Sequence, residues 1–260
     1  MATRLDEIAD RIYAISTFVP QIGPRGFGFN QLLVDAEEPL LFHCGMRALF
    51  PAVREAVARV MPPERLRWIG FSHVEADECG SMNAWLAAAP RATVVQGQVG
   101  CMVSINDLAD RPPRALADGE GLDLGGRRVR LFATPQVPHN WEAVVLFEEE
   151  TQTLLAGDLL ASDGEGPAVT TADVSEHVLE SERMFRAHAL PPGAGATLAR
   201  LAALRPRTMA SMHGSAFQGD CAAVLRRIGA GLEELAAELR RGAACDDPSG
   251  KEGDAAPPAP

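Results

Sequence analysis

A histidine and two carboxylates alternate within five residues of the segment Phe71-Ser72-His73-Val74-Glu75-Ala76-Asp77-Glu78-Cys79-Gly80. Small or apolar residues separate His73, Glu75 and Asp77, so in an extended or loosely turned backbone the three side chains project to one side. An imidazole and two carboxylates this close together can share a bound cation, and a divalent or trivalent metal is the simplest explanation. A solvated acidic loop is the alternative, because short motifs also occur by chance.

The segment lies between a predicted strand and a predicted helix. Residues 66–71 are rich in β-branched and aromatic side chains, which favours a buried strand, whereas residues 82–86 favour a helix. The candidate ligands therefore occupy a strand-to-helix loop. Loops at the ends of strands are where α/β folds place their functional sites.

Three further polar residues follow predicted strands in the same way. His139 comes after residues 127–134, in a stretch that two prolines stiffen; Asp158 comes after residues 153–156; His213 comes after residues 207–212. A lone histidine is more often structural than a ligand, and an aspartate after glycine is more often a turn or helix cap. Their common placement nevertheless predicts one shared metal site with six ligands: His73, Glu75, Asp77, His139, Asp158 and His213.

The other three histidines are assigned structural roles. His177 and His188 fall in a predicted helix, and His43 ends a strand with no acidic residue beside it.

The remaining pattern predicts two β-rich halves with helices packed outside them. Strands are expected at 11–19, 29–34, 39–43 and 93–95 in the first half and at 127–134, 143–148 and 153–156 in the second. Helices are expected at 51–60, 175–189, 197–204 and 220–241, whereas residues 110–126 read as a loop or the edge of a sheet and 162–176 as a long loop. Residues 1–241 are expected to form one domain, and 242–260 an acidic, Pro- and Ala-rich disordered tail.

Charge and composition argue against several classes of partner. The formal net charge is −11, and no basic stripe with interleaved aromatic residues occurs, which disfavours nucleic acid and anionic membrane surfaces. No apolar run approaches the about 18 residues of a membrane helix, and the first residues contain no signal-peptide pattern. The five cysteines are scattered, without a Cys-x-x-Cys pair, so we expect a reducing, cytoplasmic location.

The order and spacing of the candidate ligands resemble the metallo-β-lactamase fold in its diiron branch. His-x-Glu-x-Asp is followed by His139, Asp158 and His213 in the order found in oxygen-binding diiron proteins and the diiron domain of flavodiiron proteins. The resemblance covers nearly all of residues 8–240. It implies a four-layer αβ/βα sandwich with the metals at the edge of the two sheets.

The resemblance also implies a ligand set for two iron ions with a bridging oxygen. His73, Glu75 and His139 would hold one ion, Asp77 and His213 the other, and Asp158 would bridge them. Zinc hydrolases of this fold usually have a histidine where Glu75 stands. A carboxylate makes the site harder, which favours iron over zinc.

Two departures from the family bear on function. Many relatives have a histidine directly after the motif's aspartate, whereas this sequence has Glu78, so we expect water or Glu78 at that position of the second metal. The sequence also contains no Gly-rich phosphate loop for FMN and no flavodoxin-like domain. The resemblance therefore implies a diiron protein that binds O2 or NO and either reduces it, with electrons from a separate donor protein, or senses it.

Other functions remain open at this stage. A dinuclear zinc hydrolase acting on an ester, thioester or lactone is the main alternative, since a metal-bound water is a strong nucleophile. A metal-stabilised interaction protein, using the acidic tail and the last helix, is the third. The sequence leaves both a monomer and a homodimer open, and it predicts no catalytic residue beyond the metal ligands.

Overall fold

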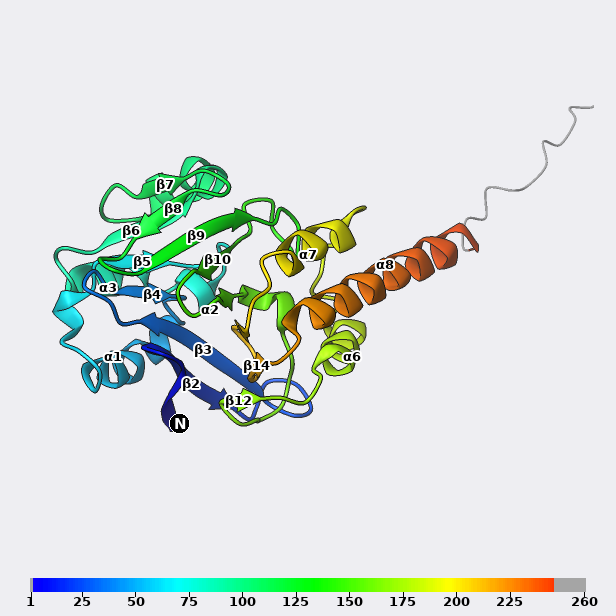
Figure 1. The fold of residues 1–260 in the computed structure, drawn as a ribbon, viewed down its shortest axis with the longest axis horizontal. Helices are drawn as coiled ribbons and strands as arrows, with labels where there is room; N and C mark the ends of the chain where they lie inside the picture. Colours follow the sequence, from blue (N-terminus) through cyan, green and yellow to red (C-terminus); the bar gives the residue numbers. More distant parts are fainter. Residues whose placement is uncertain (1, 246–260) are drawn as a thin grey trace, which may run out of the picture.

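Two seven-stranded β-sheets face each other at the centre of the domain (Figure 1). A computed structural model describes residues 2–245 of the 260-residue chain. The first sheet has the order β1-β2-β3-β4-β5-β6-β7, and the second has the order β12-β14-β13-β11-β10-β9-β8. Each half of the chain therefore builds most of its own sheet, as the pattern of strands predicted.

The first sheet begins as an antiparallel meander and continues with parallel strands after β4. Its strands are β1 Thr3–Ala9, β2 Ile12–Val19, β3 Phe27–Val34, β4 Leu40–Phe42, β5 Trp68–Gly70, β6 Thr93–Gly97 and β7 Arg114–Leu116.

In the second sheet, β9 and β11 are each antiparallel to β10, and β11 is parallel to β13. Strands β9, β11 and β13 therefore run in the same direction, and their carboxyl ends meet at one edge. The strands are β8 Gly121–Asp123, β9 Arg128–Ala133, β10 Val144–Glu148, β11 Thr153–Leu155, β12 Val169–Thr170, β13 Thr208–Ala210 and β14 Ala216–Gln218.

Helices cover the outer face of each sheet (Figure 1). The first half contributes α1 Phe50–Ala58, α2 Ala76–Cys79 and α3 Met82–Ala88, followed by a helical segment made of α4 Gln98–Gly100, the π-helix Cys101–Ile105 and α5 Asn106–Leu108. The second half contributes the 3-10 helix η4 Gly157–Leu160, then α6 Ser175–Phe185, α7 Ala194–Ala202 and α8 Cys221–Cys245. Short 3-10 turns occupy Arg47–Leu49 and Pro63–Arg65.

Three apolar clusters separate the layers. Along β10, Val145 packs with α7 and α8, whereas its neighbours Val144 and Leu146 pack against the first sheet. The same alternation occurs in β4, where Leu41 faces the α1 and α3 side. Since successive side chains of a strand point to opposite faces, each sheet buries both of its faces. The fold is the predicted four-layer αβ/βα sandwich.

Several local predictions need correction. Residues 99–108, whose pattern allowed no assignment, are helical, and the strands β1, β12 and β14 were not predicted. The segment 110–126 supplies β7 and β8, the edge strands of the two sheets, in agreement with its prediction as a sheet edge. Helix α8 continues to Cys245 rather than ending at residue 241, and residues 246–260 of the predicted tail lie outside the described residues.

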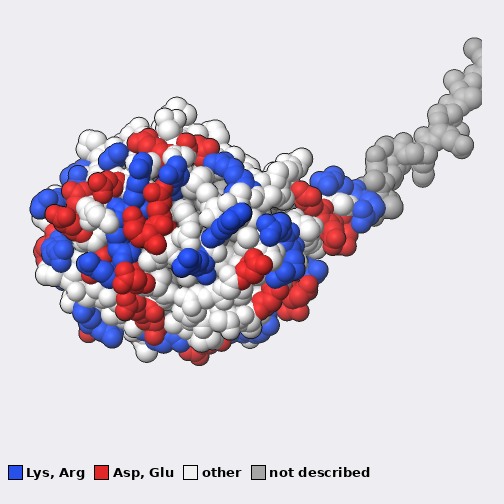
Figure 2. Space-filling view, viewed as in Figure 1, with Lys and Arg blue, Asp and Glu red and all other residues white. Residues whose placement is uncertain are grey.

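The surface carries both signs of charge (Figure 2), and four cysteines are free thiols. Basic and acidic side chains are interspersed over the face shown in Figure 2. Cys44, Cys79, Cys101 and Cys221 are free thiols. None of the helices among residues 2–245 combines the length and apolarity needed to cross a membrane.

A close contact between the two halves positions the strand ends. Gly157, with φ +54°, directly follows β11 and Ala156, and its carbonyl accepts the Met212 N–H at 2.9 Å and the Ser211 hydroxyl at 3.2 Å. A Cβ on Gly157 would lie 2.5 Å from the Ser72 hydroxyl oxygen. Only glycine allows the turns after β5, β11 and β13 to meet this closely.

Gly157→Ala should therefore lower the free energy of unfolding by more than the strain of its left-handed backbone conformation alone would. Gly126 is the matched control, because it has φ +80° and nothing within 4 Å of an added Cβ. The control should lose about 1–2 kcal/mol from left-handed strain, and Gly157→Ala a further about 1–3 kcal/mol from overpacking. Urea unfolding followed by circular dichroism measures both, and equal losses would show that the contact with Ser72 is not tight.

Candidate metal centre

All six predicted ligands lie at one edge of the two sheets. His73 and Glu75 follow β5, and Asp77 lies in α2 directly after them. The other three come from the second sheet, after β9, β11 and β13 for His139, Asp158 and His213 respectively. Because these three strands share a direction, the segments after them meet at one place, opposite the end of β5.

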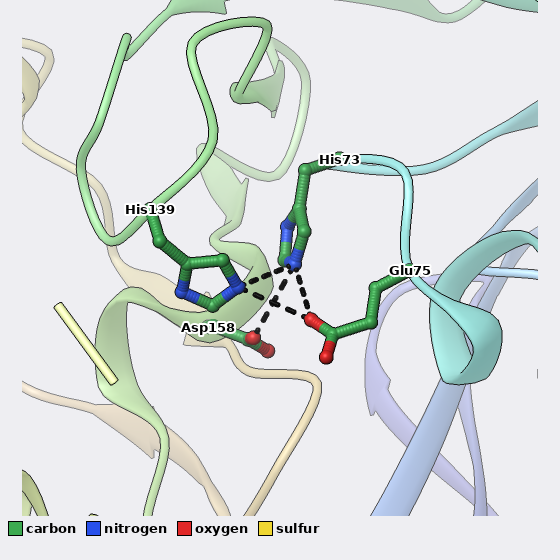
Figure 3. Close-up of side chains that lie close together, drawn as sticks. All are labelled: His73, Glu75, His139 and Asp158. Atoms are coloured by element: carbon green, nitrogen blue, oxygen red, sulfur yellow. Dashed lines mark hydrogen bonds and ion pairs between the residues drawn. The ribbon is translucent and has the colours of Figure 1, made fainter. Parts of the chain in front are cut away.

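One group of four side chains is drawn in Figure 3. His73 Nε2 lies 2.9 Å from Glu75 Oε2 and 2.8 Å from His139 Nε2, and His139 Nε2 lies 3.1 Å from Glu75 Oε2. Asp158 Oδ2 is 3.8 Å from His73 Nε2. One potential ligand atom from each of the four residues falls within 4.8 Å of the others, and the four side chains point to a common centre.

A second group shares Asp158 with the first. His213 Nε2 lies 3.4 Å from Asp77 Oδ2 and 3.4 Å from Asp158 Oδ1. The two carboxylate oxygens of Asp158 therefore face different groups, with Oδ2 toward His73 and Oδ1 toward His213. This is the arrangement expected of a carboxylate that bridges two ions.

Hydrogen bonds on the far side of two rings orient their site-facing nitrogens. His213 Nδ1 lies 2.7 Å from the Gly28 carbonyl oxygen, which only accepts, so Nδ1 carries the hydrogen and Nε2 presents a lone pair to the site. His73 Nδ1 lies 2.9 Å from the Ser72 hydroxyl. The Asp158 Oδ1 atom is buried and has no hydrogen-bond partner among residues 2–245.

This donor set fits a metal ion better than a proton. His73 Nε2, His139 Nε2 and Glu75 Oε2 lie within 3.1 Å of one another, and each can offer a lone pair. A proton on His73 Nε2 can form a good hydrogen bond with only one neighbouring atom, whereas a metal cation placed among these atoms can be bound by all of them. Convergent imidazoles and carboxylates with an unpartnered buried oxygen are the pattern of a metal site.

The charges around His73 point to the same conclusion. Burial lowers the pKa of His73, but the carboxylates of Glu78, Glu75 and Asp158 have the larger, opposite effect and raise the pKa to about 10. Hydrogen bonds from His139 and His73 lower the pKa of Glu75. The cluster therefore stabilises positive charge among these side chains, whether that charge is a proton or a metal cation.

The second group has the same character. Burial lowers the pKa of His213, but Asp158 and Asp77 raise it to about 9. Burial raises the pKa of Asp77, but its hydrogen bond with His213 lowers it below the usual value. Burial also raises the pKa of Asp158, against the opposing effect of His213. Both groups thus pair buried imidazoles with carboxylates.

The site opens on the side of Glu75 and His139. The Glu75 side chain is 52% exposed and that of His139 is 23% exposed, whereas the His73 side chain is fully buried. Trp141, two residues after His139, is one of the most exposed large apolar side chains among the described residues. A small ligand or a partner protein can approach from this side.

Glu78 does not occupy a position at the second group. It is fully buried, and its carboxylate accepts the backbone N–H groups of Ser72 and His73 at 2.7 and 3.0 Å. Of the two alternatives expected at that position, water or Glu78, the Glu78 carboxylate points away from the second group. Its side chain turns into the interior because these donors hold it there.

Several residues that support the site were not predicted as functional. The Asn30 amide donates to the carbonyls of Ser211 and Gly214 at 2.9 and 2.8 Å and so clamps the loop that carries His213. Glu142 accepts the Val74 N–H at 3.1 Å between His73 and Glu75. Such contacts join residues far apart in the chain, so no local spacing could reveal them.

The other histidines lie outside the two groups. His177 Nε2 contacts the Asp163 carbonyl at 3.0 Å, and His188 Nδ1 contacts Glu182 at 2.7 Å. His43 is buried beneath the site, with Nε2 3.5 Å from Glu78 Oε1. A structural role for these three histidines stays a prediction. His188 follows α6, which ends at Phe185 rather than at the predicted residue 189.

Comparison with known proteins identifies the family. The model of the family described as "ODP family beta lactamase" matches residues 27–214, a span that contains all six candidate ligands. Rubredoxin-oxygen oxidoreductase of Megalodesulfovibrio gigas is 24% identical over 206 residues, which is 76% of this chain and 51% of that protein. The chain thus spans about half the length of this relative, and 24% and 28% of two diflavin flavoproteins from cyanobacteria.

Solved structures share the fold at low sequence identity. Rubredoxin oxygen:oxidoreductase from Desulfovibrio gigas superposes with a TM-score of 0.73 at 18% identity, covering 90% of this chain and 62% of that one. The metal-soaked Flv1 flavodiiron core from Synechocystis superposes with a TM-score of 0.77 at 18% identity, covering 91% and 62%. With the family match over most of its length, the chain belongs to the ODP family of β-lactamase-like proteins and has the metallo-β-lactamase fold of the flavodiiron cores.

Proposed function

We propose that this protein is a non-haem diiron protein that binds O2 or NO, and that it either reduces the gas with electrons from a separate donor protein or senses it. The observation that carries this proposal is the position of Asp158, whose two oxygens face two groups of histidine and carboxylate ligands. The family match and the names of the relatives, an oxygen oxidoreductase and a flavodiiron core, support it.

His73, Glu75 and His139 would hold one ion, Asp77 and His213 would hold the other, and Asp158 would bridge them. Three carboxylates and three imidazoles form a harder, more anionic set than a histidine-rich zinc site, and this favours iron. Two iron ions held by these residues would supply an open coordination position and one electron each to a diatomic ligand.

The protein's own residues then orient the ligands and control access. The Gly28 carbonyl and the Ser72 hydroxyl orient the His213 and His73 rings, so that Nε2 of each faces the centre. The buried His73 side keeps water away, whereas the exposed Glu75 side admits a small gas. The same opening is where we place the approach of an electron donor.

The metal content and its response to O2 test the proposal directly. The full-length chain, expressed with both iron and zinc available, should contain about two iron ions, as expected of a dinuclear site. Its visible spectrum should change when the anaerobically reduced protein meets O2 or NO. Two zinc ions with no spectral change would contradict the proposal and move a hydrolase acting on an ester, thioester or lactone to first place.

Ligand substitutions should separate the site from the other histidines. His73→Ala and Asp158→Ala each remove an atom that faces the centre, so plasma mass spectrometry should find the loss of at least one of the two ions. His177→Ala is the control, because His177 contacts the Asp163 backbone outside the two groups. It should keep the wild-type metal content, and a His73→Ala variant with full metal content would mean that the ligand assignment is wrong.

A further inference from the structure

Glu78 lies directly behind His73, on the side away from the candidate metal centre. The side chain is fully buried, and three hydrogen atoms converge on its carboxylate. Oε2 accepts the N–H groups of Ser72 and His73 at 2.7 and 3.0 Å, and Oε1 accepts the Ser72 hydroxyl at 2.6 Å. An ionised carboxylate has only lone pairs, so it satisfies all three donors at once.

The Ser72 hydroxyl links Glu78 to the His73 ring and determines which ring nitrogen carries the hydrogen. Its single hydrogen is donated to Glu78, so toward His73 Nδ1, 2.9 Å away, the hydroxyl oxygen can only accept. Nδ1 must therefore carry a hydrogen. The lone pair of the neutral ring is then on Nε2, the atom that faces Glu75, His139 and Asp158.

We propose that Glu78 is a positioning residue that acts through Ser72 to hold the His73 ring with Nε2 ready to bind metal, and that it is not itself a ligand. This inference rests on the proposed metal centre. It also assigns the second ion only Asp77, His213 and the shared Asp158 among the side chains of the two groups. A position at that ion is then left for water or for the gas.

Two buried ring nitrogens, His73 Nδ1 and His43 Nε2, each lie 3.5 Å from Glu78 Oε1, farther away than the Ser72 hydroxyl at 2.6 Å. His43 Nε2 has no hydrogen-bond partner among the described residues. The Gly157 turn, which carries Asp158 next to it, packs against Ser72 at the same place. The Ser72–Glu78 pair thus lies beneath ligands from both sheets. A change in its hydrogen bonds would alter the orientation of the His73 ring.

Glu78→Gln is the sharpest test, because it keeps the shape and replaces one acceptor by a donor. The amide oxygen can take over the two backbone N–H groups, which leaves the NH2 group facing the Ser72 hydroxyl. The hydroxyl then loses its acceptor, and its hydrogen competes with His73 Nδ1–H. Loss of such support for a ligand histidine typically weakens metal binding about 10- to 100-fold.

Two measurements on the full-length chain follow this effect. Competition with a chromophoric chelator gives the dissociation constant for Co2+, and we expect it to rise about 10- to 100-fold in Glu78→Gln. Proton NMR of the Zn2+-loaded chain detects the His73 Nδ1–H signal. Its exchange with solvent should be slow in the wild type and faster in the variant, which a purely structural role for Glu78 would not produce.

Two further variants keep the inference testable. Ser72→Ala removes the acceptor for His73 Nδ1–H while Glu78 remains, so it should reproduce both effects even where Glu78→Gln folds poorly. Glu148→Gln is the matched control, since Glu148 is fully buried and accepts the Thr151 N–H at 2.8 Å at the far end of β10. It should lose stability but keep the Co2+ affinity and the His73 signal.

The outcomes separate this inference from the proposed function. If the wild type binds two metal ions and both Glu78→Gln and Ser72→Ala keep its affinity and Nδ1–H exchange, the inference is wrong and the diiron proposal stands. If the wild type binds neither Co2+ nor Zn2+, the metal centre is wrong, and the inference that depends on it falls with it. Weaker Co2+ binding in both variants, with the Glu148→Gln control unchanged, supports the proposal that Glu78 acts through Ser72 to hold the His73 ring.

Discussion

The convergence of imidazole and carboxylate side chains on one shared positive charge is the interaction on which the rest of this structure depends. The Nε2 atoms of His73 and His139 are 2.8 Å apart, with a Glu75 oxygen within 3.1 Å of both. A proton or a metal cation among these atoms attracts all of them, and without it their negative partial charges would repel one another. The molecule holds them together with a rigid sandwich on one side and, in the proposed function, metal ions on the other.

The sandwich achieves this through the direction of its strands. Strands β9, β11 and β13 run the same way, so the segments after them meet opposite the end of β5. Close contacts then join the two sheets, with Gly157 against Ser72 and with the Asn30 amide bound to the carbonyls of Ser211 and Gly214. The Gly157 carbonyl and the Asn30 amide both have hydrogen-bond partners in these contacts, which hold the loops in fixed positions.

A second layer of residues determines how the ligands face the centre. Gly28 and Ser72 each bind the far nitrogen of a ligand ring, and Glu78 lies behind Ser72. Glu78 directly follows Asp77 in the motif, but its carboxylate binds Ser72 and the His73 backbone behind the first group and does not face the second group.

The sequence by itself was enough to predict a shared site for the candidate ligands and most of the fold. The alternation of His73, Glu75 and Asp77 and the strand-to-helix pattern around them are local properties, so both could be predicted from the order of residues. The pattern of strands and helices predicted two β-rich halves with helices packed outside, and the resemblance to the metallo-β-lactamase fold implied the four-layer sandwich. Residues 99–108 and the strands β1, β12 and β14 were missed because their local apolar pattern is weak. Strand β1 pairs with its neighbour in the chain, β2, whereas β12 depends on pairing with the distant β14.

Only the tertiary structure decided which atoms meet. The two oxygens of Asp158 face different groups, and Glu78 points inward rather than toward the second group. Asn30 and Glu142 support loops from which they are separated by many residues. The physical reason is that side-chain direction depends on the donors and acceptors that the complete fold brings near, and a linear spacing does not contain those neighbours.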